Sequence, residues 1–268
     1  MKKCFICGGE LIKYGEVNGM DIFKCNFCGL GKTENLKVQN GEYHRDESYI
    51  EEEKLFENIF EKRVNRIIKF VKKGKVLEIG CSTGLLLSLF KKNGWEVKGV
   101  EISKKSAEKA REKGIEVIST PFEQAQFSEK FDLVILNHTL EHLERPMEVL
   151  KKVNIMLNEK GILFVDVPNF GGLSARLQGK NWPLLLPEEH LWHFTKKSLD
   201  ILLQSLGFKI VYCERSSGIW NVYNPLLEIY NSLIHFKKRF FEEIFTAVPS
   251  WIVSKIRMGS DLMVIAKK

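Results

Sequence analysis

Four cysteines near the start of the chain have the types and spacing of a metal site. Cys4 and Cys7 form one C-x-x-C pair, Cys25 and Cys28 form a second pair, and seventeen residues lie between the pairs. Four thiolates close a tetrahedral shell around Zn²⁺ and leave no position open for a substrate, so the metal would be structural. We therefore expect residues 1–32 to form a zinc ribbon. Four buried cysteines without a metal are the alternative.

The ribbon should contain a β-hairpin in which Leu11–Tyr14 pairs with Asp21–Lys24 through a turn from Gly15 to Gly19. Ribbons often bind nucleic acid, but no cluster of arginines with exposed aromatic residues accompanies this one. Contact with RNA is therefore the weaker interpretation. A ribbon that covers or completes a neighbouring site is the other.

A glycine-rich turn between two apolar runs has the layout of a nucleotide-binding site. Residues 76–79 predict a buried strand, a turn runs from Gly80 to Gly84, and a helix and a second strand, residues 96–100, follow. The two glycines let the backbone approach a ligand closely, because no Cβ stands in the way. Glu101 ends the second strand, where a carboxylate can accept hydrogen bonds from both ribose hydroxyls.

The acidic residue before this turn separates two classes of nucleotide cofactor. The stretch contains E-x-G-x-S-x-G rather than G-x-G-x-x-G, and Glu78 stands two residues before Gly80. A carboxylate there would repel a pyrophosphate, but it suits a ligand with a cationic amino-acid part. The stretch resembles motif I of the class I S-adenosylmethionine (SAM) methyltransferases, with Ser82 where many members have glycine. An ordinary strand–turn–helix unit is the alternative.

This resemblance implies which residues bind SAM. The turn would surround its amino-acid part, the acid after the second strand would bind its ribose, and Phe122 could pack against its adenine or simply anchor a loop. The predicted cofactor-binding residues are Glu78, Gly80, Cys81, Ser82, Gly84, Glu101, Phe122 and Asn137.

Histidines occur in two segments farther along the chain. The apolar run Phe131–Asn137 predicts a strand, and His138 and His142 follow its carboxyl end, where ligands bind in open α/β sheets. His190 and His193 stand three residues apart in an H-x-x-H-F-T segment. Because the unperturbed pKa of histidine lies near neutrality, a histidine here could act as a general base. We predict that these four histidines are catalytic.

The segments that carry these histidines strengthen the resemblance, which covers residues 75–208. The H-x-x-H-F-T segment resembles the substrate-side lid of methyltransferases of ubiquinone biosynthesis and of sugars. It is also similar to small-RNA 2′-O-methyltransferases, in which Glu, His and a later His hold a divalent metal. That resemblance implies a candidate divalent-metal site at Glu141, His142 and His190. Alternatively, His142 caps or packs, and the later histidines shape the pocket wall.

The remaining apolar periodicity predicts an α/β fold with a Rossmann-like, doubly wound, seven-stranded and mostly parallel sheet, preceded by the ribbon. The last strand is antiparallel in the family that the chain resembles. We expect a linker and an N-terminal helix over residues 33–73 and a methyltransferase domain over residues 74–268. Other strands are expected at 116–119, 162–167, 208–212 and 261–266, and helices at 45–72, 104–113, 147–157 and 198–206.

An amphipathic helical insertion is expected at about residues 219–258, where apolar residues recur at helical spacing. It could lie on a membrane or contact a lipid-linked substrate, cap the substrate site, or form a dimer face. Packing into the core is the alternative.

The composition sets outer limits on these interpretations. The chain has 268 residues, of which 44% are hydrophobic, with a net charge of +7 and a pI near 9.0. This size suffices for one α/β core and a small appendage. The charge allows contact with RNA, phosphorylated substrates or an anionic membrane without requiring any of them. With neither a secretory signal nor a membrane-spanning run, a cytoplasmic location, with peripheral membrane contact as an option, is expected.

The resemblance implies a SAM-dependent methyltransferase acting on a small hydroxylated molecule, such as a sugar or a lipid-linked intermediate. An rRNA or tRNA methyltransferase is the first alternative. The N-P-P-Y type of motif that would support base N-methylation is missing at the relevant strand ends, where N-H-T-L and V-P-N-F occur instead. A non-catalytic SAM-binding scaffold is the second alternative, and the set Glu78, Gly80, Gly84 and Glu101 argues against it.

Overall fold

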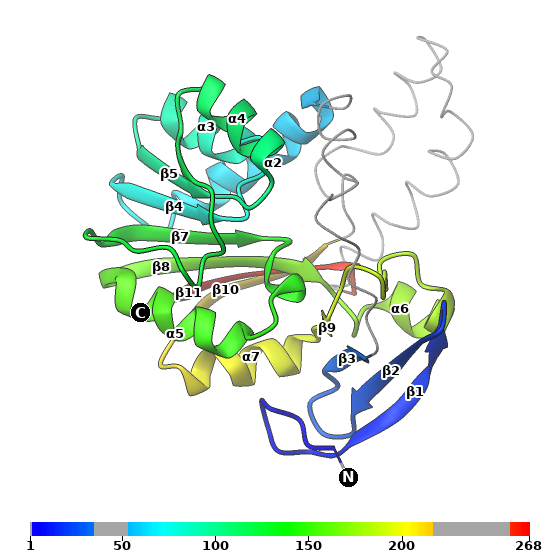
Figure 1. Cartoon of the computed structure of the whole chain (residues 1–268). Helices are drawn as coiled ribbons and strands as arrows, with labels where there is room; N and C mark the ends of the chain where they lie inside the picture. Colours follow the sequence, from blue (N-terminus) through cyan, green and yellow to red (C-terminus); the bar gives the residue numbers. More distant parts are fainter. Residues whose placement is uncertain (1, 35–52, 217–257) are drawn as a thin grey trace.

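A computed structural model describes residues 2–34, 53–216 and 258–268 of the chain. Within these ranges a seven-stranded sheet forms the centre of the molecule (Figure 1). Its strands, in spatial order, are β10 (Lys209–Ser216), β11 (Asp261–Lys267), β8 (Leu157–Pro168), β7 (Phe131–Asn137), β4 (Lys75–Ile79), β5 (Glu96–Val100) and β6 (Glu116–Ile118).

The strand directions confirm the expected fold class. β4 pairs in parallel with β5 and β7, β5 with β6, and β7 with β8, whereas β11 runs antiparallel to both β8 and β10. The central strand β7 is an unbroken apolar run because both of its faces are covered. Leu133 and Ile135 face one hydrophobic cluster, and Val134 and Leu136 face the other.

Helices cover the two faces of the sheet, as the doubly wound arrangement requires (Figure 1). One face carries α2 (Glu53–Ile67), α3 (Leu85–Lys92) and α4 (Lys104–Glu112), and the other carries α5 (Pro146–Met156) and α7 (Lys196–Ser205). Ser103 caps α4 through its side chain, and Thr195 and Ser198 form a capping box on α7. These caps fix the loops that leave the carboxyl ends of the strands.

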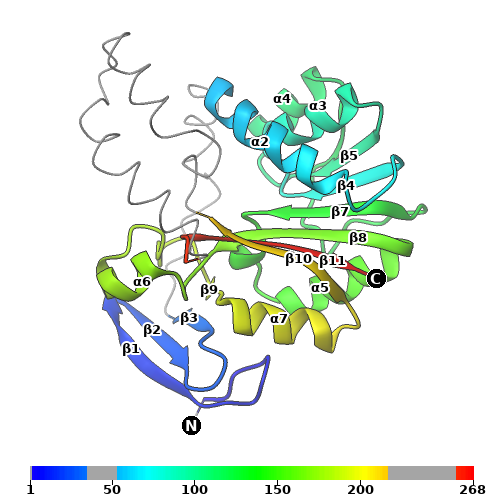
Figure 2. The same ribbon diagram turned by 180° about the vertical axis from the view of Figure 1, so that it is seen from behind.

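A second sheet lies beside α6 (Leu173–Gln178) and α7 in both views (Figures 1 and 2). It contains β1 (Leu11–Val17), β2 (Met20–Cys25), β3 (Gly31–Glu34) and β9 (Trp192–His193), all antiparallel. The first three strands belong to the N-terminal segment. The fourth comes from the loop between β8 and α7, so the N-terminal sheet is completed by the main body of the molecule.

The expected hairpin turn from Gly15 to Gly19 is wrong by several residues. β1 and β2 continue until Val17 pairs with Met20, and only Asn18 and Gly19 form the turn. Both turn residues have positive φ, 52° and 77°. An Asn-Gly pair favours the two-residue turns that match the twist of a hairpin. This dipeptide is the sequence signal that locates the turn.

Two predicted elements are affected by the limits of the described ranges. The helix expected at residues 45–72 appears as α2, which begins at Glu53, directly after a segment outside those ranges. The insertion expected at 219–258 falls almost wholly on residues 217–257, which also lie outside them. None of the described helices has the length and apolar composition to cross a membrane.

Candidate functional site

A cavity of about 400 Å³ opens at the carboxyl ends of β4, β5 and β7. The turn after β4, the end of β5, the Pro121–Glu123 loop and the residues after β7 line it. It brings all the predicted cofactor-binding residues except Gly84 to one wall, because parallel strands end at the same edge of the sheet.

The two glycines of the turn have left-handed backbones, with φ 73° at Gly80 and 72° at Gly84. A Cβ on Gly80 would lie 2.7 Å from Thr139 Oγ1, and one on Gly84 would lie 2.5 Å from Ile115 Cδ1. A side chain at either position would therefore crowd neighbouring protein atoms, which is why the turn needs glycine. Gly80 lines the cavity, and the approach of a ligand to these glycines stays a prediction.

Two carboxylates of the cavity have opposite surroundings. Glu101 accepts hydrogen bonds from the backbone N–H groups of Ser82 and Ser103, each at 2.8 Å, which hold it beside the turn. Glu78 is fully buried, and burial raises its pKa well above the usual range, against the opposing charge of Arg63. A cationic ligand beside Glu78 would therefore favour its charged form, which burial alone disfavours.

Three buried polar atoms that line the cavity have no hydrogen-bond partner within the described residues. They are Glu78 Oε2, Ser82 Oγ and Asn137 Oδ1. Because a buried polar atom without a partner is costly, such a cluster indicates a ligand that supplies hydrogen-bond donors. Phe122 is buried at the same cavity, with Lys152 Nζ 4.6 Å from its ring centroid.

The half-buried His138, which lines the cavity, pairs with the buried Glu141, which does not line it. His138 Nδ1 lies 3.5 Å from Glu141 Oε1, and His138 has a left-handed backbone with φ 50°. Burial opposes the charged form of His138, but Glu141 and Asp166 outweigh it and raise its pKa. For Glu141 burial is likewise outweighed by the neighbouring histidines, which lower its pKa to about 2.

His142 and His190 extend this cluster, with ring centroids 4.8 Å apart. Their Nδ1 atoms contact backbone carbonyls, His142 that of Glu189 at 2.9 Å and His190 that of Leu184 at 3.2 Å. A neutral ring that donates from Nδ1 presents Nε2 as an acceptor or metal ligand. One possible ligand atom from each of Glu141, His142 and His190 lies within 4.8 Å of the others.

The four histidines predicted to be catalytic thus divide into two pairs. His138 and His142 line the cavity, whereas His190 and His193 are buried and do not line it. His193 Nε2 lies 2.8 Å from Thr33 Oγ1. Burial, and then the neighbouring His190, lower the pKa of His193 to about 3. A neutral His193 that contacts Thr33 of β3 is better suited to a structural role beside the cavity than to proton transfer.

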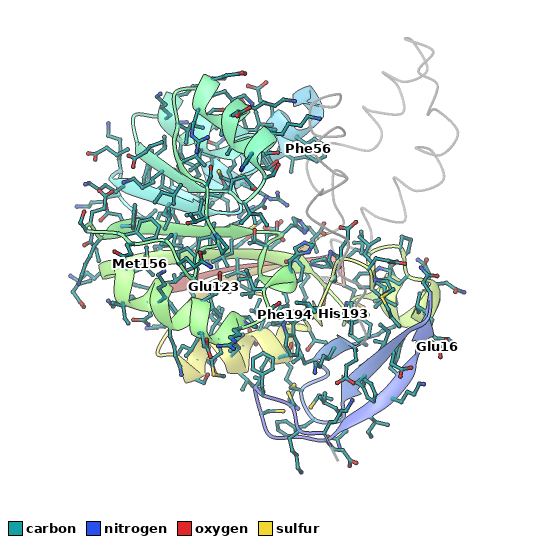
Figure 3. The ribbon with its side chains drawn as sticks, viewed as in Figure 1. Glu16, Phe56, Glu123, Met156, His193 and Phe194 are labelled. Atoms are coloured by element: carbon teal, nitrogen blue, oxygen red, sulfur yellow. The ribbon has the colours of Figure 1, made fainter. Side chains whose placement is uncertain are left out.

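The N-terminal sheet joins this wall through its edge strand. β3 pairs with β9 at Gly31 and His193, and the Thr33 N–H donates to the Leu191 carbonyl at 2.9 Å. The Leu191 N–H in turn donates to the Glu141 carbonyl at 3.0 Å. Figure 3 shows His193 and Phe194 where the main body meets the N-terminal sheet. β9 could not be predicted from its sequence, since two residues are too few for a periodicity signal.

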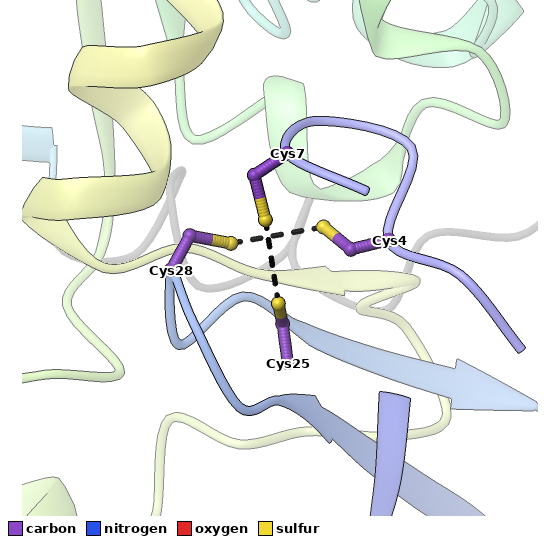
Figure 4. A group of neighbouring side chains, drawn as sticks. All are labelled: Cys4, Cys7, Cys25 and Cys28. Atoms are coloured by element: carbon purple, nitrogen blue, oxygen red, sulfur yellow. Dashed lines mark hydrogen bonds between the residues drawn. The ribbon is translucent and has the colours of Figure 1, made fainter. Parts of the chain in front are cut away.

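The four N-terminal cysteines converge on one point (Figure 4). The Sγ atoms of Cys4 and Cys28 are 3.7 Å apart, and those of Cys7 and Cys25 are 3.5 Å apart. Tetrahedral ligands at a Zn–S distance of about 2.3 Å would be about 3.8 Å apart. The donor set and its size therefore fit a structural zinc ion.

Comparisons with known proteins agree with this geometry. A family model described as a methyltransferase domain matches residues 51–212. An uncharacterized protein of Methanocaldococcus jannaschii is 31% identical over 57% of this chain and 73% of its own. The C-methyltransferase NovU of Streptomyces niveus is 31% identical over 51% of this chain, but the match spans only 33% of NovU. A ubiquinone biosynthesis O-methyltransferase of an Azoarcus species is 27% identical over 61% of this chain and 78% of its own.

Solved structures support the same fold. A SAM-dependent methyltransferase from Archaeoglobus fulgidus has a TM-score of 0.56 at 22% identity, over 82% of this chain and 99% of that chain. The cavity fits SAM, because the unpartnered acceptors Glu78 Oε2, Ser82 Oγ and Asn137 Oδ1 match the ammonium and hydroxyl donors of that molecule. As the family model covers more than half of its length, the chain belongs to the methyltransferase-domain family and is a SAM-dependent methyltransferase.

Proposed function

We propose that the chain methylates a small hydroxylated molecule, such as a sugar or a lipid-linked intermediate. The observation that carries this proposal is the pairing of His138, which lines the cofactor cavity, with the buried Glu141. Two relatives support the substrate class, since one is named a C-methyltransferase and another a ubiquinone biosynthesis O-methyltransferase. These names describe the two relatives, and the acceptor class of this chain is our proposal.

In this proposal SAM supplies a methyl group that its sulfonium charge already activates. Glu78, Ser82 and Asn137 hold its polar groups, and Glu101 fixes the turn beside it. His138 Nε2 accepts the proton of the acceptor hydroxyl, and Glu141 stabilises the imidazolium that results. His142 borders the acceptor on the same wall.

A divalent ion held by Glu141, His142 and His190 is a second candidate role for this wall. The two Nδ1 contacts to carbonyls favour it, because they orient both Nε2 atoms as ligands. One carboxylate and two imidazoles with open positions suit Mn²⁺, Fe²⁺, Co²⁺ or Zn²⁺. An ion there would compete with His138 for Glu141, so the two roles are separable.

Metal analysis distinguishes these sites. We expect one zinc ion per chain at the ribbon, lost in Cys4→Ser and kept in His190→Ala. A second ion per chain, lost only in His190→Ala, would establish the divalent-metal role and count against His138 as the base. If the purified wild-type chain contained no zinc, the assignment of a zinc ribbon would be wrong.

The acceptor class is tested with purified protein and methyl-labelled SAM added to a fractionated cell extract. Label in a small-molecule or solvent-extractable fraction is expected. Label in RNase-sensitive material would overturn the proposal and favour an rRNA or tRNA substrate. SAM binding without transfer to any fraction would favour a non-catalytic scaffold. A cytoplasmic location, oligomerisation and lipid contact through residues 219–258 stay predictions.

A further inference from the structure

A second groove lies between the ribbon and the main body. Its volume is about 1,030 Å³, and it shares no lining residue with the cofactor cavity. Lys24 and Phe27 line it from the ribbon, and Phe170, Arg176 and the first turn of α7 line it from the main body. Ligands often bind at such junctions between two structural units.

The charged side chains of this groove are mostly cationic. Among the described residues that line it, Lys24, Arg176, Lys196, Lys197 and Arg215 are cationic, Asp200 is the only carboxylate, and Cys7, Cys25 and Cys28 are three of the four predicted zinc ligands. Asp200 is already paired with Lys196 within α7. The N-terminus of α7 adds the positive end of a helix dipole to the same groove.

Lys24 and Arg176 are the most informative of these cations. Lys24 is half-buried, with its Nζ 4.9 Å from the ring centroid of Phe170 and 5.3 Å from that of Tyr14. The rings favour a cation at this place, but they carry no net charge that could neutralise it.

The ribbon zinc is a competing explanation for this charge, because four thiolates around Zn²⁺ carry a net charge of −2. Lys197 lies at that end of the groove, where it donates to the Phe27 carbonyl at 2.7 Å, beside Cys28. Lys24 precedes Cys25 in the chain, but its Nζ lies over the Phe170 ring, and Arg176 lines the groove from α6. Because Asp200, the only carboxylate among the described lining residues, is paired with Lys196, the charges of Lys24 and Arg176 are left for another anion.

We propose that this groove binds a phosphate or diphosphate group, with Lys24 and Arg176 as its main contacts. Guanidinium matches phosphate geometry with two parallel hydrogen bonds, and a lysine adds a point charge. Single-stranded RNA fits less well, because base stacking needs a free aromatic face. Lys197 Nζ lies 3.7 Å from the centroid of the exposed Phe27 ring and covers one of its two faces, so this ring offers a base only its other face. The proposal does not depend on the methyl acceptor.

Isothermal titration of the full-length, zinc-loaded chain with inorganic pyrophosphate at low salt tests the proposal. Wild type should bind one pyrophosphate, and Lys24→Met and Arg176→Gln should each weaken binding by about tenfold or more. Arg145→Gln is the matched control, since Arg145 is exposed and lies outside the groove. It removes the same charge and should change the affinity less than twofold. SAM affinity should be unchanged in all three variants, which shows that they are folded.

Three results would overturn the proposal. They are no pyrophosphate binding to wild type, equal weakening in Arg145→Gln, and loss of zinc rather than of pyrophosphate in Lys24→Met. An oligouridine that binds more tightly than pyrophosphate, with the same sensitivity to Lys24→Met, would replace the phosphate ligand by RNA. Comparing the affinities for glucose 1-phosphate and inorganic phosphate then shows whether the groove prefers an organic phosphate ester or the free anion. Tighter binding of the ester indicates an organic phosphate, and equal binding indicates the inorganic anion.

Discussion

The two halves of the proposed active site, one for the cofactor and one for the methyl acceptor, are built in different ways. The cofactor half comes from nearly contiguous sequence, in which β4, the turn, α3, β5 and Glu101 follow one another. The acceptor half combines the residues after β7 with the segment around β9, and β3 of the ribbon supports it. Thr33 and His193, which meet there, are 160 residues apart. One half is thus a local motif, and the other exists only when distant segments have come together.

If the two halves are separable, a substitution at His138 should lower the rate of methyl transfer without changing the affinity for SAM. We expect His138→Asn to lower kcat by about 10³-fold, since general-base catalysis typically contributes 10²–10⁴-fold. The Kd of SAM should change less than twofold. Single-turnover transfer and SAM titration measure the two effects. An unchanged kcat would remove His138 as the base.

Glu101→Gln should have the opposite profile. The two oxygens of Glu101 accept separately from Ser82 and Ser103, whereas glutamine keeps one oxygen and turns its NH2 group toward the other N–H. The variant also loses the negative charge beside the turn. We expect the Kd of SAM to rise by about 10- to 100-fold, with the zinc content unchanged. A variant that binds SAM as wild type does would contradict the assignment of the cofactor half.

Acid should weaken the acceptor half through His193. Its pKa of about 3 in the folded chain lies below the ordinary histidine pKa of about 6.5, so the unfolded chain binds the proton more readily between these two pH values. Stability from this residue is therefore complete above pH 6.5 and is lost as the pH falls toward 3. Urea unfolding should show a dependence of at most about 1.4 kcal/mol per pH unit, reduced in His193→Gln. An identical pH slope in wild type and variant would contradict this.

The smallest effect is expected for Thr33→Val, which keeps the shape of the side chain and removes one hydrogen bond to His193. A loss of about 1 kcal/mol in stability is expected. The KM of the acceptor should rise, and the Kd of SAM should stay within twofold. Thr139→Val is the matched control on the cofactor side, where the hydroxyl donates to the Ile79 carbonyl. If Thr33→Val raised the Kd of SAM as much as the KM of the acceptor, the two halves would not be separate.

The sequence predicted the local half well and the non-local half poorly. β5 and β7 begin and end at the predicted residues, because apolar runs between turn residues locate buried strands. The histidine-bearing segments were also identified. Their division into cavity residues and wall residues was not, since it depends on β9 pairing with β3. A two-residue strand has no periodicity, and its partner β3 lies about 160 residues earlier in the chain.

The pairing of β3 with β9 also has a consequence for biosynthesis. The strands β1, β2 and β3 leave the ribosome before β9, which is translated about 160 residues later. At typical elongation rates the edge of β3 would stay unpaired for roughly 10 to 30 seconds. An unpaired edge strand invites pairing with other chains. We therefore expect chains that stop before residue 190, or that lack the ribbon, to aggregate during expression, each with a strand edge that lacks its partner.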